Sequence, residues 1–96
     1  MLRKLQEELN NTEKFYESFF QSKDGKSSLD FVYKNFYPVD KKFDETSNLQ
    51  LSIDFIIEQM QNWLFEKLTD DEMDSAYVWF ESLEPELRSL IEDGLT

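Results

Sequence analysis

The sequence predicts an all-α protein, a compact bundle of four to six helices. Apolar residues recur at the three- and four-residue spacing of a helix through most of the chain, and helix-capping patterns precede two of these runs. Only two prolines and two glycines interrupt the 96 residues. A chain of this length supports one hydrophobic core, so we expect residues 1–96 to form a single acidic helical domain.

The first helical run extends from Leu2 to Phe20. Inside it, Asn10-Asn11-Thr12 could cap a new helix, so the pattern allows one helix or two. The stretch 22–27 contains the pair Asp24-Gly25, which is typical of a tight turn. We therefore expect the chain to break there.

Residues 28–37 fit both the helical and the β-strand spacing of apolar residues. Apolar side chains recur at helical spacing through the segment, and every second residue is apolar from Leu29 to Tyr33, as in one arm of a short β-hairpin near residues 20–35. Helix is favoured, because the other arm of that hairpin itself has helical spacing and an isolated two-stranded ribbon is marginally stable. Pro38 should end this helix, and a loop should follow.

The most regular element is a long helix that should begin at Ser47. Ser47 and Gln50 have the spacing of a capping box, and the apolar residues that follow fall on one helical face. That face comprises Leu49, Ile53, Ile56, Ile57, Met60, Trp63, Leu64 and Leu68.

A second capping box, Thr69 with Glu72, should open the next helix, whose apolar face, Met73, Ala76, Tyr77, Phe80 and Leu83, ends before Pro85. Pro85 is expected to start a separate short helix, because proline suits the first turn of a helix. Gly94 suits the C-terminal cap of that last helix.

The composition excludes several classes of function. The chain has no cysteine and no histidine, which removes disulfides, thiolate and histidine catalysis, and the common zinc sites. Its net charge of −11 opposes binding to nucleic acid or to anionic membranes. No pair of carboxylates stands out, so we expect no enzyme activity, no metal and no cofactor. Charged residues interrupt the N-terminus before any leader-like apolar run, so we expect a cytoplasmic protein.

The negative charge is concentrated in the second half of the chain. Residues 1–48 carry nine acids and eight bases, whereas residues 49–96 carry twelve acids and two bases. Acids near a helix N-terminus are stabilised by its dipole, so the run could be only a solvated face. The other interpretation is a surface that binds a basic protein. The candidate acids for that surface are Glu66, Asp70, Asp71, Glu72, Asp74 and Glu81.

Three apolar residues of the long helix lie away from its core face. With Ile53 at 0°, Leu51, Phe55 and Phe65 lie at roughly 160°, 200° and 120° on a helical wheel. Either this helix is buried on both sides, or the three residues belong to an interface. Trp79, at the rim of its own helix face, suits the core or a binding surface.

These features predict a small acidic, non-enzymatic binding protein. In size, acidity, aromatic content and lack of catalytic residues, the chain resembles the small inhibitors of phages and mobile elements, namely anti-CRISPR proteins, DNA mimics and immunity proteins for nuclease toxins. The resemblance implies a stoichiometric inhibitor of a nuclease or another nucleic-acid-binding protein, with no direct contact to nucleic acid or membrane. The alternative is a helical adaptor or homodimer that associates through an apolar face of the long helix.

Overall fold

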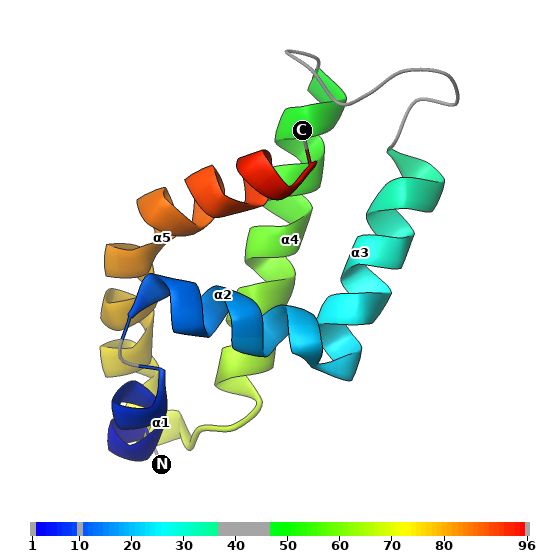
Figure 1. Cartoon of the computed structure of the whole chain (residues 1–96). Coiled ribbons are helices and arrows are strands. Elements are labelled where there is room, and N and C mark those ends of the chain that lie inside the picture. Colours follow the sequence, from blue (N-terminus) through cyan, green and yellow to red (C-terminus); the bar gives the residue numbers. More distant parts are fainter. Residues whose placement is uncertain (1, 10, 37–46, 96) are drawn as a thin grey trace.

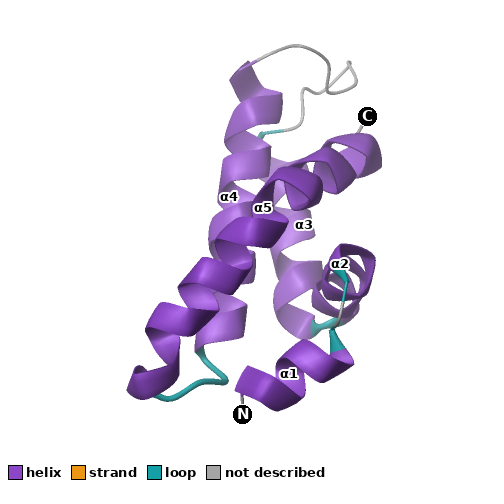
Figure 2. Ribbon diagram, turned by 90° about the vertical axis from the view of Figure 1, so that its left-hand side faces the viewer, coloured by secondary structure: helices purple, strands orange, loops and turns teal. Residues whose placement is uncertain are grey.

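Helices account for every regular element in the computed structural model, which describes residues 2–9, 11–36 and 47–95. They are α1 (Leu2–Glu8), α2 (Thr12–Gln21), α3 (Lys23–Asn35), α4 (Ser47–Phe65) and α5 (Met73–Leu95). One 3-10 turn, η1 (Asp70–Glu72), precedes α5. Figure 2 shows helices and loops in these ranges and no strand. The predicted all-α fold class is confirmed.

The helix α4 lies at the centre of the fold (Figure 1). It packs against α3 on one side and α5 on the other, while α2 crosses it and contacts both of those helices. The face of α4 predicted to be apolar is buried from Leu49 to Leu64, and Leu68 beyond the helix is partly buried. The core therefore sits around α4, where the helical period places it.

Aromatic rings join α2 to α4 and α5. Phe15 and Phe19 meet the ring of Trp63 edge-on, with centroids 5.7 and 5.5 Å apart. Phe15 also lies 5.9 Å from Trp79 and 5.8 Å from Phe80. We call these five residues the aromatic cluster. Edge-on pairs of this kind add about 0.5–1.5 kcal/mol each beyond their buried area.

The first run is two helices. Asn11 is the N-cap of α2, and its side-chain Oδ1 accepts a hydrogen bond from the Lys14 N–H at 2.9 Å. A capped start satisfies backbone donors that a continuous helix would pair internally, so the cap fixes the break.

The chain breaks within residues 22–27 as predicted, but it does so at Ser22 and not through a tight turn at Asp24-Gly25. Only Ser22 separates α2 from α3, and it caps both: its N–H donates to the Phe19 carbonyl at 3.0 Å, and its Oγ accepts from the Gly25 N–H at 3.1 Å. Gly25 lies inside α3 with negative φ. Glycine at this position instead allows α3 to lie close to the end of α2, because a Cβ there would lie 1.9 Å from the Phe19 carbonyl oxygen.

The hairpin considered near residues 20–35 does not form, since α3 is helical from Lys23 to Asn35. The helical period wins because it buries Val32 against α4 and leaves Phe31 and Tyr33 partly exposed. The predicted stop at Pro38 and the loop after it lie outside the described residues. The helix α4 begins at Ser47 as predicted, whereas the Ser47 capping side chain is outside what the structure describes.

The predicted break at Pro85 is also wrong, because α5 runs through it to Leu95. The missing proline N–H removes one backbone hydrogen bond and costs about 3 kcal/mol in a helix interior. The core face stays in phase across it: Ala76 and Phe80 before the proline and Leu87 and Ile91 after it are all buried. A proline inside a helix commonly bends it. Figure 1 shows α5 bent, with its yellow and orange-red halves running in different directions.

Gly94 also differs from its predicted role. It lies within α5 with negative φ, so it is not a left-handed cap. A Cβ at this position would lie 2.7 Å from the Tyr16 hydroxyl oxygen, so the glycine makes room for that side chain of α2.

The two glycines give a matched pair of tests. Gly25→Ala should lower the free energy of unfolding by about 2–3 kcal/mol, because its Cβ meets α2 backbone that cannot move without shifting the helix. Gly94→Ala should change it by less than about 1 kcal/mol, because its Cβ meets only the end of a side chain and alanine favours the helix. Urea denaturation followed by circular dichroism measures both. Equal losses in the two variants would contradict this account.

Candidate protein-binding surface

Four exposed acids lie at the turn between α4 and α5. Glu66 follows the end of α4, Asp70 and Asp71 lie in η1, and Asp74 lies in the first turn of α5. We call this group the acidic corner. Glu66 and Met73 line the same shallow depression, so both sides of the turn contribute to one surface. No ion pair joins these four acids to a base within the described residues.

The base closest in sequence does not neutralise the acidic corner. The Lys67 Nζ lies 4.2 Å from the centroid of the Trp63 ring and 3.3 Å from the Trp63 carbonyl oxygen, to which it donates a hydrogen bond. A cation over an indole face is stabilised by the ring and by that carbonyl. Lys67 remains a cation there and forms no ion pair with the acidic corner, and the four acids against this one base leave the turn with a net negative charge.

Glu72 acts within the fold. One carboxylate oxygen accepts a hydrogen bond from the Leu2 N–H at 2.6 Å, and the other accepts from the Thr69 N–H at 3.1 Å. The predicted capping box of Thr69 and Glu72 is confirmed. The same carboxylate also links this turn to the start of α1 through the Leu2 N–H. These backbone hydrogen bonds, with that from Leu2 the larger cause, lower the pKa of Glu72 to about 2.

The outer face of α5 carries exposed apolar side chains beside the acids. Tyr77 is 47% exposed and Val78 is 67% exposed. A hydrogen bond between the Tyr77 hydroxyl and the Glu81 carboxylate raises the pKa of Tyr77. Sequence reasoning placed Tyr77 on the buried face and passed over Val78. A helical wheel of α5, like the one used for the long helix α4, would have identified Val78, since Val78 lies on the opposite side of the helix from the buried residues Ala76 and Phe80.

Trp79 belongs to the aromatic cluster. It is partly buried and packs edge-on against Phe15. Its ring supports the crossing of α2 over α5, and the side chain is only partly accessible to a partner.

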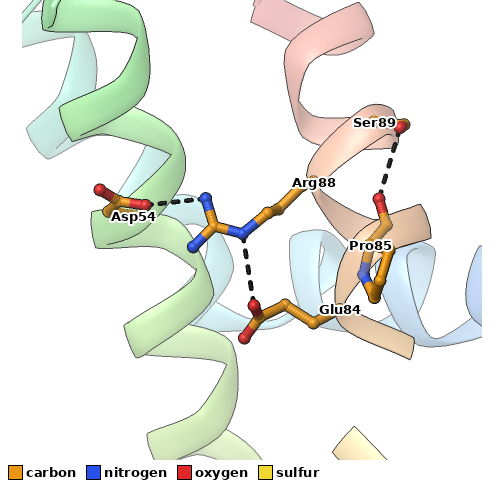
Figure 3. Close-up of polar contacts among 5 residues, drawn as sticks. All are labelled: Asp54, Glu84, Pro85, Arg88 and Ser89. Atoms are coloured by element: carbon orange, nitrogen blue, oxygen red, sulfur yellow. Dashed lines mark hydrogen bonds and ion pairs between the residues drawn. The ribbon is translucent and has the colours of Figure 1, made fainter. Parts of the chain in front are cut away.

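The second base of this half of the chain is also engaged. Arg88 reaches between two carboxylates, with its Nη1 2.8 Å from Asp54 Oδ1 and its Nε 3.4 Å from Glu84 Oε2 (Figure 3). Asp54, and then Glu84, raise the pKa of Arg88. In the same view, the Ser89 hydroxyl donates to the Pro85 carbonyl. The pair with Asp54 links α4 to α5 away from the acidic corner.

The three apolar residues singled out on α4 do not form one patch. Phe55 stacks on Phe31 of α3, with ring centroids 4.7 Å apart and planes at 23°. Leu51, one turn earlier, is 50% exposed. Phe65 is partly buried and lines the depression that Glu66 and Met73 share, at the other end of α4.

The described residues hold no group of three or more metal-ligating side chains and no helix long and apolar enough to cross a bilayer. Comparisons of the chain with protein-family models, with curated proteins and with solved structures find no match. The surface itself therefore supplies the basis for a functional proposal.

Because hydrogen bonds in the folded state hold the pKa of Glu72 at about 2, below its ordinary 4.5, ionised Glu72 stabilises the fold. That contribution is complete above pH 4.5 and is lost as the pH falls through 2. Glu72→Gln should therefore be less stable than the parent at pH 7 and should approach it in acid. Urea denaturation at several pH values measures this difference, and Glu81→Gln is the control. A Glu72→Gln deficit that did not shrink between pH 4.5 and pH 2 would contradict the assignment.

Proposed function

We propose that this chain is a non-enzymatic protein-binding domain that inhibits a nucleic-acid-handling protein by occupying its basic surface. The observation that supports this is the acidic corner, whose four exposed carboxylates lie on a turn held between two packed helices. Both bases of this half of the chain are engaged elsewhere, Lys67 against Trp63 and Arg88 between Asp54 and Glu84.

The electrostatics favour a basic partner. Unbalanced negative charge costs self-repulsion, which a basic surface relieves on binding. Carboxylates on a rigid surface present negative charge as nucleic-acid phosphates do, so a groove that binds phosphates attracts them. The protein would then act as a stoichiometric competitor, of the DNA-mimic, anti-CRISPR or immunity-protein type.

Tyr77 and Val78 supply the apolar contact that such an interface needs. Charge complementarity mainly raises association rates, whereas buried aromatic and aliphatic anchors slow dissociation. Both residues are exposed on α5, within one turn of Asp74 or Glu81 along the helix. A partner that contacts the acidic corner and this face would therefore use both kinds of interaction.

The test is capture of partners from a lysate of the source at low salt, followed by binding kinetics with the partner identified. The triple variant Asp70→Asn, Asp71→Asn, Asp74→Asn should associate at least about tenfold more slowly than the parent, because three charges that steer the encounter are gone. The parent's association rate should also fall steeply with ionic strength.

A charge-matched control separates location from total charge. Glu8→Gln, Glu13→Gln and Glu17→Gln remove the same three charges from the exposed surfaces of α1 and α2, and this variant should keep most of the association rate. Circular dichroism checks that both variants remain helical. A tight partner that is indifferent to salt and to the acidic-corner substitutions would refute the proposal.

The alternative, an adaptor or homodimer, is favoured by one observation: Leu51 is half exposed beside the Phe31–Phe55 stack on the α3–α4 side. If this surface mediates self-association, light scattering should show a dimer that Leu51→Asp converts to monomer with the helical signal unchanged. Leu51 is the better probe than Phe55, because Phe55 packs between the helices and its substitution would also disturb the fold. A monomer at millimolar concentration would exclude this alternative.

A further inference from the structure

A cavity of about 170 Å³ lies where α2, α3, α4 and the C-terminal end of α5 meet. Its walls are mainly apolar and come from all four helices, with Phe20, Leu29, Ile56 and Ile91 among them. This volume is close to that of an engineered apolar cavity of about 150 Å³ that binds benzene. One six-membered ring with a small substituent therefore fits the space.

Two tyrosines line this space, Tyr16 of α2 and Tyr33 of α3, and the Tyr16 hydroxyl is the one that lies beside Gly94. Tyr16 and Gly94 both line the cavity, and the Tyr16 hydroxyl oxygen lies 2.7 Å from the point where a Cβ on Gly94 would stand. The hydroxyl thus lies on the Gly94 side of the cavity, in space that a Cβ at Gly94 would crowd. Within the described residues the Tyr16 hydroxyl donates no hydrogen bond, although the side chain is half-buried. A donor in such a place is satisfied by water or by a ligand with an acceptor.

The surroundings select against a charged ligand. Burial, together with Tyr33 and Asp93, raises the pKa of Tyr16, so the hydroxyl remains a neutral donor. Asp93 is next to Gly94 in α5 and would repel an anion. The residues that line the cavity carry no charge, so a charged ligand of either sign would be buried there without an ion pair.

We propose that this cavity is a binding site for one neutral, single-ring aromatic molecule with a hydrogen-bond acceptor, held by the Tyr16 hydroxyl and the apolar walls. The ring replaces water or empty space against Phe20, Leu29, Ile56 and Ile91, and the acceptor pairs with the Tyr16 donor. This site is separate from the acidic corner and does not rest on the proposed inhibitory function.

The experiment uses three probes of similar shape on the full chain: phenol, toluene, which replaces the hydroxyl with a methyl group, and benzoate, which is an anion. Amide chemical shifts in ¹H–¹⁵N spectra report binding at Gly94 and Leu95. Phenol should bind saturably with a dissociation constant on the order of 1 mM or tighter. Toluene should bind roughly fivefold more weakly, since it cannot accept the hydrogen bond, and benzoate should not bind.

Tyr16→Phe is the informative variant, because it keeps the ring and removes the hydroxyl. It should bind phenol and toluene equally, whereas the control Tyr77→Phe, on the exposed face of α5, should keep the preference for phenol. Absence of saturable shifts at Gly94 and Leu95 with all three probes would overturn the site. Equal affinity of the parent for phenol and toluene would overturn the role of Tyr16 and the ligand class.

Discussion

The crossing of α2 over α4 and α5 is the contact on which the rest of the structure depends. Phe15 and Phe19 project from one short helix into Trp63 and the α5 aromatics, so a ten-residue helix holds two longer ones together. Isolated helices of ten residues are marginal in water, and α2 is therefore stabilised by this burial more than by its own propensity. Without it, α3 and α5 would have no common partner besides α4.

Close approach between helices explains both glycines. Gly25 allows the start of α3 to lie against the last turn of α2, where a Cβ would meet the Phe19 carbonyl. Gly94 leaves room for the Tyr16 hydroxyl at the far end of α5. In both places a short distance between elements, and not a positive φ, excludes a side chain. The cavity beside Gly94 is a consequence of the same geometry, since four helices converge there around two tyrosines.

Some of the carboxylates stabilise the fold, and others are exposed without an ion-pair partner within the described residues. Glu72 binds backbone N–H groups of α1 and of the turn before α5, while Asp54 and Glu84 hold Arg88. These carboxylates stabilise the packing of helices that are otherwise joined by apolar contacts. The acidic corner stands apart, because its carboxylates have no such partner within the described chain, and this difference is what directs the functional proposal to that turn.

Features that depend on neighbours within a turn or two could be predicted from the sequence. The helical period identified the buried face of α4, and capping patterns located the Thr69–Glu72 box and marked Asn10-Asn11-Thr12 as a possible start of a second helix. The acidic corner could also be found from sequence, because acids at a helix start remain at the surface.

Features that depend on distant contacts became apparent only in the tertiary structure. Gly25 predicts a turn from sequence, whereas in the structure it allows the Phe19 carbonyl to lie close to α3. Pro85 predicts a helix break, whereas the buried residues before and after it hold α5 together as one bent helix. Glu72 reads as a surface acid, but Leu2, seventy residues away, donates to it. A periodic pattern records which face is buried, whereas it does not record which backbone or side chain will lie opposite, because that depends on how the helices cross.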